Sequence, residues 1–156
     1  MSVEQLLQLP DETATADFGA RLASVLPEQA VIFLEGDLGA GKTTLVRALL
    51  RALGHQGAVR SPTYTLVEPY EIADRSLYHL DLYRLGSPEE LEDIGIRDLL
   101  AQPCVLLIEW PERGAGVLPE PDLRLILTAA GAGRALTVRA ATPLGGKLLK
   151  DAGVFS

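Results

Sequence analysis

The chain has 156 residues, of which 47% are hydrophobic and 22% charged, and its formal net charge is −7. A chain of this length and composition is typical of one globular domain. Its acidity argues against broad binding to nucleic acid, which depends on Lys and Arg contacts to phosphate. No apolar run approaches the roughly 20 residues of a membrane span, and the first residues do not resemble a secretory signal. The single cysteine, Cys104, allows no internal disulfide, so we expect a cytoplasmic protein without membrane contact.

The first third of the chain predicts alternating strands and helices. Residues 3–9 predict a short strand, and residues 11–26 predict a helix with one apolar face. Residues 30–35 form a short apolar run that ends before Gly36, which is typical of a strand buried on both faces. Residues 43–53 predict a second helix, because leucines recur at four-residue spacing and a glycine follows. Strand, glycine loop and helix therefore come in the order that a phosphate-binding loop requires.

Two antiparallel hairpins are predicted in the rest of the chain. The first joins residues 64–72 to residues 77–85, and the second joins residues 123–128 to residues 135–139 around a glycine-rich turn. Between the hairpins, residues 104–108 form another continuous apolar run, which predicts a further buried strand.

An acidic helix is predicted just after the first hairpin. Ser87, Pro88 and Glu90 form a capping box with proline at the first helical position. The acids of this helix favour a solvated face, with a docking surface for a partner protein as the alternative. Together the elements predict one α/β domain over residues 1–156, a mixed sheet of the P-loop NTPase type with parallel central strands, flanking helices and antiparallel hairpin additions.

Residues 36–43 match the phosphate-binding pattern G-x-x-x-x-G-K-[ST] at every fixed position. The glycines allow backbone conformations in which several N–H groups converge on phosphate oxygens, and the following helix directs its positive N-terminal end at the same anion. In this pattern Lys42 reaches the terminal phosphates, and the hydroxyl of Thr43 is placed to bind Mg²⁺. We expect a nucleoside triphosphate to be bound by the loop and the residue after it, namely Gly36, Asp37, Leu38, Gly39, Ala40, Gly41, Lys42, Thr43 and Thr44.

Hydrolysis also needs a carboxylate near the metal and a group that orients water. Glu109 follows the apolar residues 105–108, and the carboxyl ends of parallel strands are where ligands bind in open α/β sheets. Asp81 ends a second, less apolar segment. The sequence pattern does not decide which of Glu109 and Asp81 binds the metal and which orients the water. Ser61 and Thr63 lie before the first hairpin, where the residues alone favour an ordinary turn; the alternative is that their hydroxyls contact Mg²⁺ or sense a γ-phosphate.

Five motifs follow one another in the order found in a bacterial protein family. They are GDLGAGKTT at 36–44, SPTYTLV at 61–67, YHLDLYR at 78–84, EEL at 89–91 and EWPE at 109–112. Together they closely resemble the TsaE (YjeE) family, the ATPase subunits of tRNA threonylcarbamoyladenosine biosynthesis. The resemblance runs from about residue 10 to residue 139, and the short tail beyond carries no motif.

This resemblance implies a protein that binds ATP with Mg²⁺ and hydrolyses it weakly until partner subunits engage it. The implied partners are the threonylcarbamoyl-transferase subunit TsaD and its inactive paralogue TsaB, so tRNA is met mainly through the complex. It also implies that Thr43 and Glu109 bind Mg²⁺, that Asp81 and Lys42 serve hydrolysis, and that residues 61–63 form a switch segment. The residues implied to lie on the adenine side are Asp11, Glu12 and Arg134.

Other classes of function compete with this one. A small-molecule kinase shares the phosphate loop but usually adds an arginine-rich lid, whereas Arg113, Arg124 and Arg134 are scattered over different predicted elements. A GTPase normally carries an [NT]-K-x-D motif, and this chain has none. A nucleotide-gated scaffold, in which ATP binding orders an interface and hydrolysis is incidental, fits every motif.

The other reactive side chains predict supporting roles. Cys104 heads an apolar strand, which favours a buried core thiol. His55 and His79 lack the spacing of metal ligands and predict structural or surface positions. Trp110 directly follows Glu109, so nucleotide binding nearby should change its fluorescence.

Overall fold

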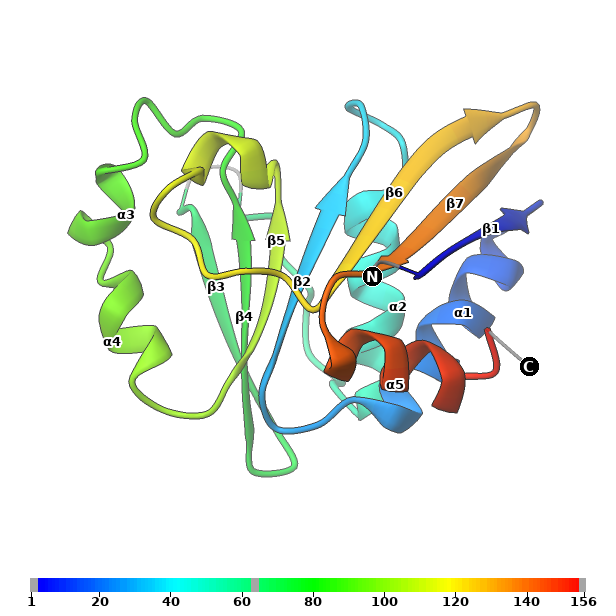
Figure 1. Ribbon diagram of the computed structural model, residues 1–156, viewed down its shortest axis with the longest axis horizontal. Coiled ribbons are helices and arrows are strands. Elements are labelled where there is room, and N and C mark those ends of the chain that lie inside the picture. Colours follow the sequence, from blue (N-terminus) through cyan, green and yellow to red (C-terminus); the bar gives the residue numbers. More distant parts are fainter. Residues whose placement is uncertain (1–2, 63–64, 155–156) are drawn as a thin grey trace.

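The computed structural model describes residues 3–62 and 65–154, and in this part of the chain seven strands form one mixed sheet (Figure 1). The pairs β6–β2, β2–β5 and β5–β4 are parallel, and the pairs β1–β7, β7–β6 and β4–β3 are antiparallel. This arrangement confirms the predicted parallel centre with antiparallel hairpins. In spatial order the strands are β1 (Val3–Leu9), β7 (Gly133–Ala140), β6 (Leu123–Ala130), β2 (Ala30–Glu35), β5 (Val105–Glu109), β4 (Arg75–Asp81) and β3 (Val67–Ile72).

The parallel strands end at one edge of the sheet, at the top in Figure 1. Asp81 at the end of β4 lies directly beside Glu109 at the end of β5, and Leu34 of β2 lies on the other side of Glu109. Because strand register sets which residues are neighbours, the segments that follow these three strands begin side by side. The functional site is built at this edge.

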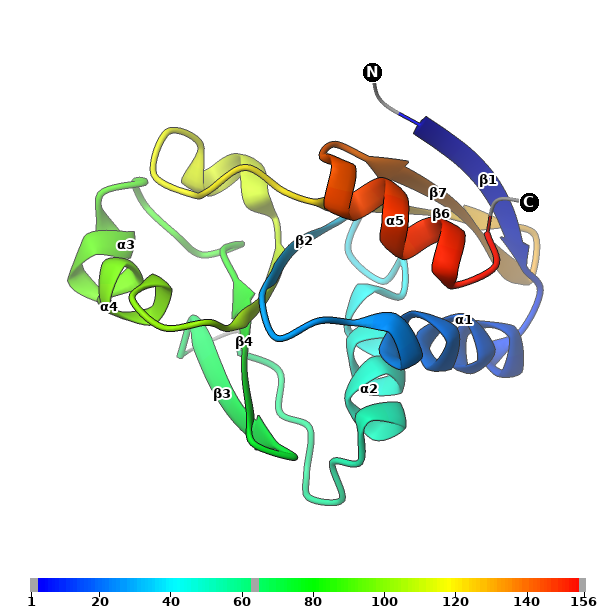
Figure 2. The ribbon, with the colours of Figure 1, turned by 60° about the horizontal axis from the view of Figure 1, so that its bottom comes forward.

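Helices cover the two faces of the sheet through separate hydrophobic clusters, because successive side chains of a strand point to opposite faces. Leu77 and Leu107 belong to the first cluster, and Leu80 and Leu106 belong to the second. The first cluster includes α1, α2 and α5, with α1 packed between the other two (Figure 2). The second includes α3 and α4. The helices are α1 (Glu12–Val25), α2 (Lys42–Leu53), α3 (Glu90–Asp93), α4 (Ile96–Leu100) and α5 (Pro143–Asp151), with a 3₁₀ turn at Pro111–Gly114.

Helices α1 and α2 approach most closely where Gly19 faces Ala48. A Cβ atom at residue 19 would lie 2.9 Å from the Cβ of Ala48 and 3.1 Å from the backbone nitrogen of Leu49. The backbone of α2 cannot move aside as a flexible side chain can, so this position requires a residue without a side chain. Because α2 begins at the phosphate loop, the contact also holds the loop against the rest of the domain.

Substitution of Gly19 by valine should lower the free energy of unfolding by about 2 kcal/mol, the usual cost of overpacking a close contact. Urea unfolding followed by circular dichroism measures this change. The control is Gly146→Ala in α5, where the added Cβ meets no atom of the described residues within 4 Å. That variant should gain about 0.5–1 kcal/mol, because alanine favours a helix over glycine. Unchanged stability of Gly19→Val would show that the two helices can separate without cost.

The first hairpin differs from its prediction in length and turn. A four-residue connection was expected, but only Ala73 and Asp74 lie between β3 and β4, with φ values of 51° and 66°. Positive φ at both positions is the turn that matches the twist of a tight hairpin. The strands are also shorter than predicted, since β4 ends at Asp81, and residue 64 lies outside the described residues.

The predicted acidic helix is divided in two, and the predicted tail contains a helix. The break falls at Gly95, where φ is 81°. The capping box predicts that the Glu90 side chain accepts from the backbone N–H of Ser87. It accepts instead from the backbone N–H of Gly86, at 3.0 Å, so the prediction is wrong by one residue. Helix α5 follows Thr142, whose hydroxyl accepts from the backbone N–H at residue 145 at 3.1 Å. No helix in the described part of the chain is long and apolar enough to cross a membrane.

Candidate functional site

The phosphate-loop motif lies between β2 and α2, as predicted. Gly36 has a φ of 142°, and a Cβ atom there would lie 2.4 Å from the carbonyl oxygen of Leu127, so only glycine fits. Helix α2 begins at Lys42 with no side-chain cap on its first N–H groups. Uncapped N–H groups and the helix dipole together favour an anion at this end.

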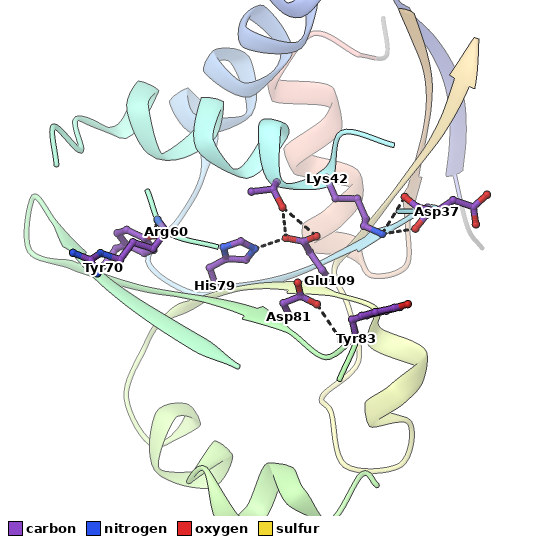
Figure 3. Close-up of polar contacts among 10 residues, drawn as sticks. Asp37, Lys42, Arg60, Tyr70, His79, Asp81, Tyr83 and Glu109 are labelled. Carbon is purple, nitrogen blue, oxygen red and sulfur yellow. Dashed lines mark hydrogen bonds and ion pairs between the residues drawn. The ribbon is translucent and has the colours of Figure 1, made fainter. Parts of the chain in front are cut away.

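Lys42 is folded back onto its own loop in this structure. Its ammonium group donates to the carbonyl oxygens of Gly36 and Asp37 (Figure 3), and it lies 3.9 Å from the centre of the Trp110 ring. The residue is only 5% exposed. Burial lowers the pKa of Lys42, and the nearby carboxylates of Glu109 and Asp81 oppose that shift. Among the described residues the ammonium forms no ion pair, so contact with the negative charge of a phosphate would stabilise it.

Glu109 connects the end of β5 to the start of α2. The Thr43 hydroxyl lies 3.1 Å from Oε2 and 3.5 Å from Oε1 of Glu109, and this carboxylate is almost fully buried. Among the described residues no group of three or more His, Cys, Asp or Glu side chains could hold a metal ion. One hydroxyl beside one carboxylate fits Mg²⁺, which takes the rest of its ligands from phosphates and water.

Asp81 lies next to Glu109 across the β4–β5 pair (Figure 3). Its Oδ1 accepts from the backbone N–H of Tyr83 at 3.0 Å. Burial raises the pKa of Asp81, with the hydrogen bond from Tyr83 opposing the shift and the charge of Glu109 adding to it. The backbone N–H of Asp81 donates to the carbonyl oxygen of Leu66, so the end of β4 is joined to the segment that follows Ser61.

His79 lies behind Glu109, two residues before Asp81 on the same strand. It is fully buried, and its Nε2 lies 2.6 Å from Oε2 of Glu109 (Figure 3). Residues two apart on a strand share a face of the sheet, so His79 and Asp81 both point toward α2.

Two of the pockets that adjoin the loop contain the predicted site residues outside it. One, of about 290 Å³, brings together most of the predicted phosphate and metal residues, and Ser61 lies on its wall. The other, of about 160 Å³, brings together the residues predicted for the adenine side. The first is lined by Leu38, Gly39, Gly41, Lys42, Thr43, Thr44, Ser61, Asp81, Glu109, Trp110 and Arg134. The second is lined by Leu9, Asp11, Glu12, Thr15, Gly41, Thr44, Leu127, Ala132, Gly133 and Arg134.

Arg134 stands between these pockets and clamps the loop. Its Nε donates to the carbonyl oxygen of Ala40 at 2.8 Å, and its Nη2 donates to that of Gly39 at 3.1 Å. The contact fixes the loop from β7, a strand almost a hundred residues further along the chain. Thr63, the other predicted switch residue, lies outside the described residues.

Comparisons with known proteins bear directly on this site. The family model described as "Threonylcarbamoyl adenosine biosynthesis protein TsaE" matches residues 9–136, which include every motif above. The chain belongs to the TsaE family. Its sequence is 48% identical over 153 residues to TsaE of Haemophilus influenzae, covering 94% of this chain and 97% of that protein. It is 44% identical to TsaE of Synechocystis, covering 67% and 69% of the two chains.

A solved structure supports the same membership. The crystal structure of Bacillus subtilis YdiB superposes on this TsaE family member with a TM-score of 0.82 and 25% sequence identity. The alignment covers 99% of this chain and 97% of that one. The resemblance stated from the five motifs is thus confirmed, and so is the fold that the order of strands and helices predicted.

Sequence reasoning missed one residue of the site in this TsaE family member. His79 was assigned a structural or surface position because the two histidines of the chain do not have the spacing of metal ligands. The available signal was its place two residues before Asp81 on a strand, which puts both side chains on one face. Its contact with Glu109 depends on the pairing of β4 with β5, which no local pattern reveals.

Proposed function

We propose that this TsaE family member binds ATP with Mg²⁺ and hydrolyses it as a subunit of the machinery that makes threonylcarbamoyladenosine in tRNA. The observation that carries the proposal is the contact between the Thr43 hydroxyl and the Glu109 carboxylate, 3.1 Å apart, at the mouth of an intact phosphate loop. With Asp81 on the neighbouring strand, this arrangement supplies what phosphoryl transfer to water requires.

Each residue has a role that follows from its position. The N–H groups at the start of α2 bind the phosphates, and Lys42 exchanges its loop carbonyls for phosphate oxygens. Thr43 and Glu109 would hold Mg²⁺, which neutralises charge on the phosphates. Asp81 orients the attacking water, because its carboxylate lies beside Glu109 without being tied to Thr43. The pocket that includes Asp11, Glu12 and Arg134 receives the adenine.

The biological setting is proposed from the printed names of the relatives, which are tRNA threonylcarbamoyladenosine biosynthesis proteins. We propose that the partners are a TsaD-type transferase subunit and its TsaB-type paralogue in the cytoplasm, and that ATP hydrolysis resets their complex between cycles. The net charge of −7 supports an indirect relation to tRNA, since wide contact with nucleic acid needs a basic surface.

ATP hydrolysis by purified protein, alone and with the partner subunits, tests this function. Glu109→Gln should lower the rate by about 100-fold or more, because the amide cannot replace an anionic metal ligand. The matched control, Glu71→Gln on the exposed surface of β3, should stay within about 2-fold of wild type. Full tRNA modification by Glu109→Gln would instead support a nucleotide-gated scaffold. Phosphate transfer to an added nucleoside or sugar would support a kinase.

A further inference from the structure

His79 occupies a position on β4 that the fold would otherwise fill with an apolar side chain. Two of its neighbours on the same face are Leu77 on β4 and Leu107, its register partner on β5, and both are fully buried in the cluster shared with α2. His79 is 0% exposed. A polar ring at such a position is unfavourable unless a hydrogen bond compensates for its lost hydration.

The only hydrogen bond that the His79 side chain makes among the described residues is directed at Glu109. A carboxylate oxygen can only accept, so the 2.6 Å contact places a proton on Nε2 of the imidazole. The other ring nitrogen, Nδ1, is buried and has no partner in the described part of the chain. In the described part of the chain, the His79 ring therefore bonds only one oxygen of the Glu109 carboxylate.

This bond distinguishes the two oxygens of Glu109. Oε2 accepts from both His79 at 2.6 Å and the Thr43 hydroxyl at 3.1 Å. Among the contacts of the described residues, Oε1 has the longer one to Thr43, at 3.5 Å. Two donors on one oxygen restrict rotation of the carboxylate, and Oε1 is left as the less engaged oxygen. Glu109 lines the pocket beside Lys42, whereas His79 does not.

We propose that His79 is the positioning residue that orients the Glu109 carboxylate for Mg²⁺, and so sets the metal affinity of the site without touching the nucleotide. The proposal rests on the proposed function, because it concerns Mg²⁺ bound together with ATP. Groups that orient a metal ligand from behind typically change metal affinity by about 10- to 100-fold when they are removed.

A purely structural role predicts a different result. If His79 served only to fill the core, its replacement would loosen α2 and the phosphate loop together. Nucleotide affinity would then fall equally with and without metal. A positioning role predicts that nucleotide affinity in EDTA is preserved while the Mg²⁺ requirement rises. The two roles are therefore distinguished by comparing nucleotide affinity in EDTA with nucleotide affinity in Mg²⁺.

The experiment compares His79→Gln with His79→Asn in the full-length protein. A glutamine can place its amide nitrogen near the position of Nε2, whereas the asparagine amide is one methylene shorter and falls short of Glu109. Both variants keep a polar side chain in the core, so a difference between them does not reflect polarity. His55→Gln, at a half-exposed histidine packed edge-on against Tyr70, is the matched control. ADP binding is measured by titration calorimetry in EDTA and over a series of Mg²⁺ concentrations.

We expect all three variants to bind ADP in EDTA within about 2-fold of wild type. The Mg²⁺ concentration that produces half of the change in ADP affinity should rise by about 10-fold or more in His79→Asn. In His79→Gln it should rise by less than about 3-fold. Equal Mg²⁺ requirements in wild type and His79→Asn would overturn the inference and leave the proposed function standing. Wild-type ADP affinity that does not respond to Mg²⁺ would overturn the inference, whereas the proposed function fails only if the purified protein with its partners does not hydrolyse ATP.

Discussion

Substitution of Lys42 by methionine should weaken ATP binding by about 30- to 160-fold. Hydrogen bonds to charged groups contribute about 1.5–3 kcal/mol each, and the upper part of that range corresponds to this factor. Methionine keeps an unbranched side chain but removes the ammonium group, which lies over the Trp110 ring and would reach the phosphates. Titration calorimetry with ATP measures the loss.

The same substitution has a second readout in the fluorescence of Trp110. In the free protein the ammonium lies 3.9 Å from the centre of the indole ring, so its departure toward phosphate changes the surroundings of the fluorophore. Wild-type emission should therefore change when ATP binds, and the change should be much smaller in Lys42→Met. Lys147→Met is the control, because this lysine is exposed on α5 and pairs with Asp151. Wild-type affinity in Lys42→Met would contradict a phosphate-binding role for the loop.

The parts of the site that the sequence predicts are those encoded locally. A strand, a glycine loop and a helix follow one another within residues 30–53, and the chemistry of the loop requires that order. Glu109 was identified because a short apolar run ends on it, which is a property of one segment. Each of these features can be read without knowing what the segment contacts in space.

The contacts that escaped prediction depend on non-local pairing. Asp81 and His79 acquire their neighbours only when β4 aligns with β5, and a shift of that register by one residue would turn both side chains to the opposite face. Arg134 was placed on the adenine side through the resemblance, and the structure adds that it bonds the carbonyl oxygens of Gly39 and Ala40. These contacts depend on how several strands pair with one another, which no single segment of the sequence encodes.

Helix α5 was missed for a different reason. Two adjacent glycines, Gly145 and Gly146, lower the intrinsic helix propensity of this segment. The helix forms because Thr142 caps its first turn and because Leu148 and Leu149 are buried in the cluster shared with α1. Tertiary packing therefore outweighs a weak local preference, as it does for most helices in domains of this size.

Substitution of Asp81 by asparagine should raise the stability of the nucleotide-free protein while it abolishes hydrolysis. Burial raises the pKa of Asp81 above its ordinary value of 3.8, so the folded state favours the neutral form. A raised pKa gives stability that is present below pH 3.8 and is lost as pH increases through the folded value. Above the folded pKa the wild-type protein therefore carries an unfavourable buried charge.

Asparagine removes this charge and keeps the oxygen that accepts from the backbone N–H of Tyr83. We expect its Tm at pH 7 in EDTA to exceed that of wild type by about 2 °C, the shift that about 0.5–1 kcal/mol produces in a domain of this size. The gain should shrink as pH falls toward 3.8, because wild-type Asp81 then becomes neutral as well. Asp17→Asn, on the exposed face of α1, is the control and should leave Tm at pH 7 unchanged.

A functional acid is distinguished from a structural one when Asp81→Asn raises Tm but lowers the rate of ATP hydrolysis. A carboxylate that stabilised the fold would lower Tm when neutralised, whereas Asp81 is retained although its charge is unfavourable where it lies. Its neighbour Glu109 accepts bonds from His79 and Thr43, and Asp81 has neither of these donors. The weaker support leaves its carboxylate available to a water molecule. A lower Tm for Asp81→Asn at pH 7, together with unchanged ATP hydrolysis, would assign Asp81 to the structure of the β4 end instead.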